Sequence, residues 1–223
     1  MDGKLAVQAI VKFAAGVLLV ALLLFVPAGT LYYRNAWLLM SVLFIPMFLA
    51  GLVMLWKSPE LLRKRLNMRE KEAEQQDVVK FSGLMFLLGF VIAGLDHRFK
   101  WLPMPGWLSV AAAVVLLLSY AAFAEVLREN AYLSRTIEVQ KDQKVIDTGL
   151  YGIVRHPMYS ATLLLFLAMP LVLGSLLSFA VFLMYPAIIT KRIRNEEQVL
   201  EAGLEGYSEY KKRVKYRLIP FIW

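Results

Sequence analysis

Apolar residues fall into five long runs that are separated by shorter stretches rich in charge. These runs occupy about residues 5–26, 37–56, 79–95, 107–127 and 158–190. A helix needs about 20 residues to cross the hydrocarbon core of a bilayer. The first, second and fourth runs therefore each predict one membrane span. The third run is short, and it predicts a span that includes residues beyond its ends.

The last apolar run is too long for one straight span. It contains Pro170, the pair Gly174-Ser175 and Pro186, which are residues that bend or end helices. Two interpretations follow: a helix–turn–helix hairpin that bends near Gly174-Ser175, or one long helix. The hairpin gives six hydrophobic helical segments in total.

The distribution of positive charge distinguishes these two interpretations. Lys and Arg gather at the N-terminus, in residues 57–80, in residues 128–157 and in the C-terminal tail, where there are eight. Cationic connections face the cytoplasm, so both termini are expected there. An even number of crossings is then required, which favours the hairpin. One long helix would place the eight cations of the tail on the outer side.

Composition agrees with an all-α integral membrane protein that crosses the bilayer several times. The 223 residues are 59% hydrophobic, and mean hydropathy is +0.59. The net charge of +8 matches anionic membrane lipids better than nucleic acid in a chain this apolar. The absence of Cys excludes disulfides and thiolate sites, and two distant His argue against a metal site. We expect one membrane domain over 1–223, with a scaffold of four spans in 1–127 and a catalytic core in 128–223.

Residues 58–78 predict a helix that lies on the membrane surface. Ser58, Pro59 and Glu60 form a helix start, with Pro at the first position and an acid near the positive end of the dipole. Leucines then lie among basic residues, a pattern typical of an interfacial helix. This helix is either a gate or lipid guide, or a solvated connector.

The loop over residues 128–157 has some predictable structure. The helix of the fourth span is expected to continue to about Leu133, residues 136–139 to be extended and residues 141–144 to form a turn.

The most informative stretch is Thr148 to Tyr159, which reads TGLYGIVRHPMY. Proline disfavours helix at the residue before it, so His156 is expected to be extended and Pro157 to begin the next helix. Free N–H groups at that helix start suit a carboxylate. Alternatively, Arg155 contacts lipid phosphate, His156 caps the helix and Tyr159 belongs to an aromatic belt.

A second cluster, Arg192, Arg194, Glu196 and Glu197, follows the last apolar run. In a helix, Arg192 and Glu196 share one face, as do Arg194 and Glu197. A carboxylate here can bind the hydroxyls or ammonium of a ligand, and an arginine can bind an anionic substrate. The alternative is a solvated helix end with surface ion pairs, which contribute little.

These segments together resemble the isoprenylcysteine carboxyl methyltransferase family, which is related to membrane phospholipid N-methyltransferases. The resemblance is carried by Gln140, the run TGLYGIVRHPMY, then RIRNEE, then GYSEYKKRV. It covers roughly Val139 to Trp223, whereas the first hundred residues resemble the family only in hydropathy. Ala161 stands where the family often has Gly, and helix 58–78 has no counterpart.

The resemblance implies a methyltransferase whose cofactor, S-adenosyl-L-methionine, binds on the cytoplasmic side. The implied cofactor-binding residues are Gln140, Gln143, Lys144, Val145, Ile146, Tyr151, His156, Pro157, Met158, Tyr159 and Glu196. Arg192 matches the family's arginine for the acceptor carboxylate, and Arg194 is a further substrate-binding candidate. Whether Glu196 or Glu197 binds the cofactor stays open.

We expect O-methylation of a lipid-like or prenylated acceptor of the isoprenylcysteine type. A carboxylate acceptor needs no general base, only alignment with the methyl donor and exclusion of water. Phospholipid amine N-methylation is the alternative within the same chemistry, and there Glu197 or His156 would act as base. A sterol-reductase-like enzyme that uses NADPH and a non-enzymatic membrane scaffold are two further alternatives.

Overall fold

A computed structural model describes residues 3–66, 73–130, 132–133 and 139–223. Within these residues the protein is helical and has no strand. The helices are α1 (Gly3–Ala28), α2 (Arg34–Lys57), α3 (Pro59–Leu66), α4 (Ala73–Phe99), α5 (Gly106–Glu129), α6 (Pro157–Val172), α7 (Leu176–Phe182), α8 (Tyr185–Gly203) and α9 (Tyr207–Arg213), with a 3-10 turn at Gly149–Gly152. The predicted fold class is confirmed.

Five helical segments are long and apolar enough to cross a membrane. They are Gly3–Ala28, Arg34–Lys57, Gln76–Phe99, Gly106–Glu129 and Leu176–Gly203, and α6 is a shorter apolar helix of 16 residues. The short third run does include residues at both ends, since α4 extends from Ala73 to Phe99. Many large apolar side chains on α1, α2 and α5 are exposed, as expected of helices that face lipid.

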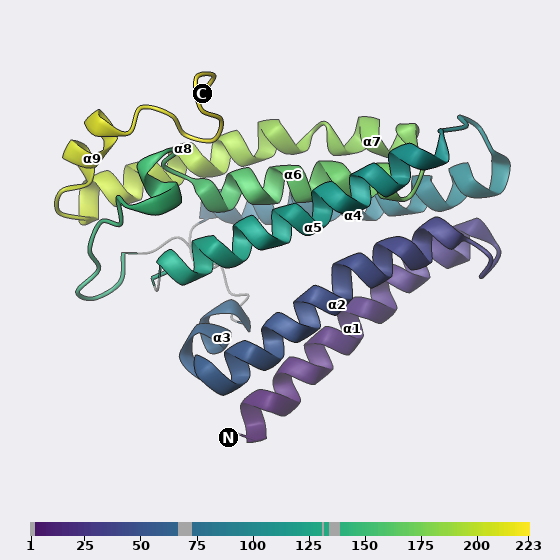
Figure 1. The fold of residues 1–223 in the computed structure, drawn as a ribbon, viewed down its shortest axis with the longest axis horizontal. Coiled ribbons are helices and arrows are strands. Elements are labelled where there is room, and N and C mark those ends of the chain that lie inside the picture. The colour runs from purple at the N-terminus through teal and green to yellow at the C-terminus, as the bar shows by residue number, and fades with distance from the viewer. Residues whose placement is uncertain (1–2, 67–72, 131, 134–138) are drawn as a thin grey trace.

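The last apolar run forms the predicted hairpin. Helix α6 ends at Val172, and Gly174 has a φ of +78°, which glycine adopts without steric cost. Ser175 then begins α7, where its Oγ accepts a hydrogen bond from the Ser178 N–H at 3.1 Å. As a result α8 runs back beside α6, and both chain ends lie at one end of the bundle (Figure 1).

The expected surface helix of residues 58–78 is two elements. Helix α3 begins at Pro59 with Glu60 in its first turn, as predicted, but it ends at Leu66. Residues 67–72 lie outside the described part of the chain, and residues 73–78 already belong to α4. The sequence pattern missed this division because the charged start of α4 resembles a surface helix.

The loop between α5 and α6 differs in detail from its prediction. Helix α5 was expected to continue to about Leu133 but ends at Glu129, with Asn130 as its cap. The Asn130 Oδ1 accepts from the Tyr132 N–H at 2.9 Å, and its Nδ2 donates to the Tyr151 hydroxyl at 3.0 Å. The turn predicted at 141–144 is present at 141–142. The extended strand expected at 136–139 falls largely on residues outside the described part.

Candidate functional site

The first wall of the site is the start of α6. Pro157 is the first helical residue, as predicted from the Arg-His-Pro sequence. His156 is non-helical but not fully extended as expected, with φ −126° and ψ 61°. The backbone N–H groups of Arg155 and His156 donate to the carbonyls of Tyr216 and Arg217, each at 2.9 Å. The C-terminal segment therefore fixes the backbone that carries His156.

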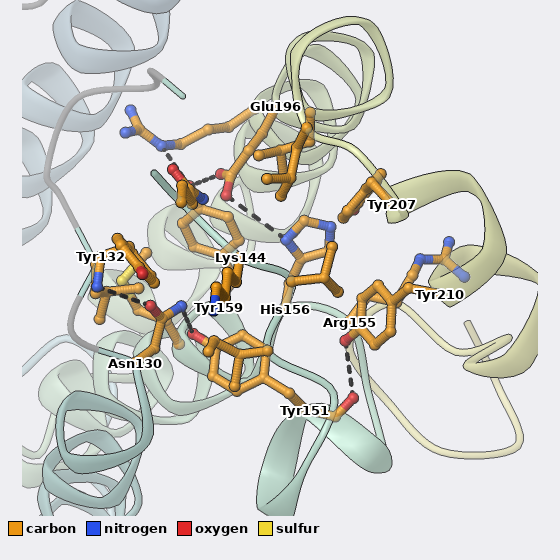
Figure 2. A pocket seen from close by; sticks show the side chains of 18 residues that line it. Asn130, Tyr132, Lys144, Tyr151, Arg155, His156, Tyr159, Glu196, Tyr207 and Tyr210 are labelled. Carbon is orange, nitrogen blue, oxygen red and sulfur yellow. Dashed lines mark hydrogen bonds and ion pairs between the residues drawn. The ribbon is translucent and has the colours of Figure 1, made fainter. Parts of the chain in front are cut away.

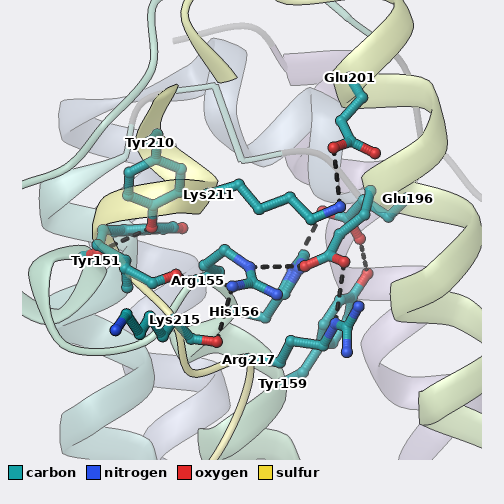
Figure 3. A network of polar contacts seen from close by, with 12 residues as sticks. Tyr151, Arg155, His156, Tyr159, Glu196, Glu201, Tyr210, Lys211, Lys215 and Arg217 are labelled. Atoms are coloured by element: carbon teal, nitrogen blue, oxygen red, sulfur yellow. Dashed lines mark hydrogen bonds and ion pairs between the residues drawn. The ribbon is translucent and has the colours of Figure 1, made fainter. Parts of the chain in front are cut away.

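A buried ionic network joins this wall to α8 and the C-terminal segment (Figure 3). Arg155 donates from Nε to Glu197 Oε1 at 2.7 Å, and from Nη1 to the carbonyls of Val214 at 2.7 Å and Lys215 at 2.9 Å. The other Glu197 oxygen accepts from Arg217 Nε at 2.9 Å. Both Arg155 and Glu197 are almost completely buried. Loss of Glu197 would leave Arg155 as a buried charge without a carboxylate partner, which is strongly destabilising.

His156 lies between the two adjacent carboxylates of α8. Its Nε2 is 3.3 Å from Glu197 Oε1, and its Nδ1 is 3.9 Å from Glu196 Oε1. Its ring stacks on that of Tyr159, with centroids 5.7 Å apart. The imidazole is thus held on one side by the buried network, and its opposite side faces Glu196.

The second wall is the face of α8 that carries Arg192 and Glu196. The predicted helix is confirmed, and both side chains reach the hydroxyl of Tyr159 on α6. Arg192 donates to it from Nε at 2.9 Å, and the hydroxyl donates to Glu196 Oε2. Tyr159 therefore connects a cation and a carboxylate that are one helical turn apart.

The third wall is the loop that leads to the 3-10 turn. Gln143 and the following residues to Ile146 line the pocket, together with Tyr151. Burial raises the pKa of Tyr151 to about 12, against the opposing effect of the hydrogen bond from Asn130. Tyr151 is therefore a neutral phenol at physiological pH.

These walls enclose a pocket with about 820 Å³ of empty space, part of it open to solvent (Figure 2). Ten of the predicted site residues line it: Gln143, Lys144, Val145, Ile146, Tyr151, His156, Met158, Tyr159, Arg192 and Glu196. Residues that are far apart in sequence therefore meet in one cavity.

Four predicted site residues are not among the residues that line the pocket. Gln140 instead bonds to other residues of the protein: its backbone N–H donates to Gln143 Oε1 at 2.8 Å, and its side-chain oxygen accepts from Lys64 at 2.7 Å. Pro157 is buried in the first turn of α6. Arg194 is exposed, and Glu197 belongs to the buried network. This geometry favours Glu196 over Glu197 as the carboxylate that contacts a ligand.

Eight residues that line the pocket were not predicted as site residues. They are Asn130, Tyr132, Leu133, Arg155, Leu200, Leu204, Tyr207 and Tyr210. A signal existed for Leu200, which follows Glu196 by four residues and so shares its helix face, whereas Leu204 lies just after the end of α8. Tyr207 and Tyr210 stood in a run that carried the family resemblance.

Comparison with known families identifies a match that covers much of the site. Residues 107–202 match the sequence model of the isoprenylcysteine carboxyl methyltransferase (ICMT) family. The matched segment extends from α5 to α8 and includes His156, Tyr159, Arg192 and Glu196. The predicted resemblance, which was placed over residues 139–223, is therefore confirmed over 139–202; the match also begins earlier, at residue 107, and does not include the GYSEYKKRV run. It supports a membrane methyltransferase.

Comparison with known proteins identifies a partial match to a sterol reductase. The chain is 35% identical over 91 residues to the Delta(14)-sterol reductase TM7SF2 of Mus musculus. These residues are 40% of this chain and 22% of that protein. The chain therefore spans only a small part of this relative's length, and the two share a segment rather than a whole architecture.

Proposed function

We propose that this chain is an S-adenosylmethionine-dependent membrane methyltransferase that acts on the carboxylate of a prenylated or lipid-like acceptor. The observation that carries the proposal is the connected group formed by Arg192, Tyr159 and Glu196 beside His156. This group lies in the pocket and within the segment that matches the ICMT family.

The chemistry of the pocket fits this cofactor. S-adenosylmethionine carries cationic sulfonium and ammonium groups, hydroxyls, a carboxylate and a planar base. The Glu196 carboxylate suits its ammonium or hydroxyl donors. Among the described residues, no hydrogen bond uses the backbone N–H and C=O groups of Lys144, Val145 or Ile146, which line the same cavity. Tyr151 and Tyr159 add aromatic surface for the base.

The residues of the chain then have distinct tasks. The cofactor, when bound, supplies a methyl group that its sulfonium activates for transfer. Arg192 holds the acceptor carboxylate by its charge, and the Tyr159 hydroxyl fixes the guanidinium by accepting from Nε. Because the same hydroxyl donates to Glu196, the acceptor-binding and cofactor-binding residues are held in one fixed arrangement.

The buried network argues against Glu197 as the base that an amine acceptor would need. A protonated amine must lose a proton before methylation, and Glu197 was one of two candidate bases for that step. Both Glu197 oxygens already accept hydrogen bonds from arginines, which stabilises the unprotonated carboxylate and makes it a poor base. A carboxylate acceptor needs no proton removal, so this arrangement suits O-methylation.

Methyl transfer from labelled S-adenosylmethionine tests the proposal. The acceptors are an S-prenylated N-acetylcysteine and phosphatidylethanolamine, presented in detergent or vesicles. We expect the prenylated carboxylate to be labelled, and the label to be released by mild alkali because a methyl ester hydrolyses. Alkali-stable label on the phospholipid would instead indicate N-methylation, and label on neither acceptor would contradict the proposed substrate class.

Two arginine variants give this assay a matched control. Arg192→Ala is expected to raise KM for the acceptor about tenfold or more, because a charge-assisted contact is lost, with a smaller effect on cofactor binding. Arg194→Ala, two residues away and exposed, is expected to stay near wild type. Equal losses in both variants would contradict the role assigned to Arg192.

The match to the sterol reductase supports a second candidate, a membrane reductase that uses NADPH. The two candidates differ in the cofactor that binds the pocket, so a binding measurement separates them before any substrate is known.

A further inference from the structure

Helix α9 closes one side of the pocket with two tyrosines. It follows a left-handed turn at Gly206, where φ is +81°. Tyr207 and Tyr210 are 4% and 2% exposed, and their rings pack together with centroids 5.7 Å apart. With Leu204 and Val214 they form a small hydrophobic cluster that holds α9 against the end of α8.

The two hydroxyl groups differ in one respect. The Tyr210 hydroxyl donates to the carbonyl of Tyr151 at 2.8 Å, so it is satisfied by the protein itself. The Tyr207 hydroxyl is completely buried and has no hydrogen-bond partner within the described chain. A buried hydroxyl without a partner is costly, and native structures rarely keep one without a reason.

The position of Tyr207 supplies such a reason. Its side chain lines the same cavity as His156 and Glu196, and Figure 2 shows it on the far side of the His156 ring from Tyr151. Packing of the ring accounts for the apolar part of the side chain. Packing does not account for the hydroxyl, because phenylalanine would fill nearly the same space without burying a polar group.

We propose that the Tyr207 hydroxyl is a ligand-binding group that hydrogen-bonds to S-adenosylmethionine in the pocket. This inference rests on the proposed function, and it adds a contact from α9 to those made by α6, α8 and the loop. The packing of α9 beside the pocket then contributes to cofactor binding as well as to the stability of the fold.

The chemical state of Tyr207 is consistent with this role. Burial raises the pKa of Tyr207, and the nearby carboxylates of Glu197 and Glu196 raise it further. The group is therefore a neutral phenol that can both donate and accept a hydrogen bond. It can match a carboxylate, an ammonium or a ribose hydroxyl of the cofactor.

The test compares Tyr207→Phe with Tyr210→Phe in the full-length protein in detergent. Two quantities are measured: the affinity for S-adenosylhomocysteine by calorimetry, and the thermal unfolding temperature without ligand. We expect Tyr207→Phe to bind about fivefold to tenfold more weakly, because one hydrogen bond to the ligand is lost. Its unfolding temperature should equal or exceed that of wild type, since no internal hydrogen bond is removed.

Tyr210→Phe provides the contrast. It loses a buried internal hydrogen bond, so its unfolding temperature without ligand should fall by about 2–4 °C. Suppose that the wild-type protein binds S-adenosylhomocysteine. The inference is then wrong if Tyr207→Phe binds it equally tightly, or if Tyr207→Phe is destabilised as much as Tyr210→Phe. If wild type itself does not bind S-adenosylhomocysteine, the proposed function fails instead.

Discussion

The adjacent pair Glu196–Glu197 shows how one residue position changes the role of a side chain. Neighbouring residues on a helix point about 100° apart. Glu196 therefore faces the pocket and Tyr159, while Glu197 faces Arg155 and the C-terminal segment. The sequence identified both acids as candidates. It left their roles open because the rotation of α8 about its axis depends on packing against α6 and the tail.

The two glutamates are expected to respond differently to the same substitution. Glu196→Gln should weaken binding of S-adenosylhomocysteine about tenfold, because a charge-assisted contact is lost, and should leave stability nearly unchanged. Glu197→Gln should lower stability by on the order of 3 kcal/mol, because the buried Arg155 loses its charged partner. Calorimetry and thermal unfolding measure the two effects.

The opposite pattern would contradict this assignment. A stable Glu197→Gln that no longer binds ligand, next to a Glu196→Gln with full affinity, would make Glu197 the cofactor residue.

At the scale of the elements, the hydrophobic segments were predictable from the sequence, but several helix boundaries were not. Apolar runs located all six segments, and Gly174-Ser175 located the bend. The end of α5 was predicted too late: the helix ends at Glu129, and the side chain of its C-cap residue Asn130 donates to the Tyr151 hydroxyl, twenty-one residues later. A contact with a residue this distant cannot be seen in local periodicity.

The bend between α6 and α7 is expected to depend on Gly174. Alanine at this position would adopt a left-handed conformation, and its Cβ would lie 2.6 Å from Asn35 Nδ2. We expect Gly174→Ala to lower the free energy of unfolding by ~1–2 kcal/mol or more from the backbone conformation alone. Thermal unfolding in detergent measures this effect.

Gly106→Ala is the matched control, because it lies at a helix start in open space. Equal stability of the two variants would show that the left-handed turn does not hold the hairpin.

At the scale of the whole molecule, the hairpin brings the two halves of the site together. It returns α8 to the end of the bundle where α6 begins, so that Glu196 meets Tyr159 across thirty-seven residues of sequence. This meeting was predictable from charge, since the cationic loop and tail were expected on one side. The contribution of α9 to the pocket lining was not predictable, because it depends on how the C-terminal segment folds back on Arg155.

The arrangement of the bundle predicts a specific labelling pattern. The chain has no Cys, so single-Cys variants report one position each. Cys at Leu177, near the bend, and Cys at Lys212, on α9, should react with a membrane-impermeant maleimide from opposite sides of the bilayer. We expect Lys212→Cys to be labelled from the cytoplasmic side. Labelling of both positions from the same side would contradict the even number of crossings.

Cofactor choice tests the central claim most directly. Purified wild-type protein is titrated by calorimetry with S-adenosylhomocysteine and, separately, with NADPH, and Glu196→Gln serves as the control for binding at the pocket. We predict saturable binding of S-adenosylhomocysteine that is weakened in Glu196→Gln, and no binding of NADPH. Binding of NADPH without S-adenosylhomocysteine would contradict a methyltransferase and favour a membrane reductase.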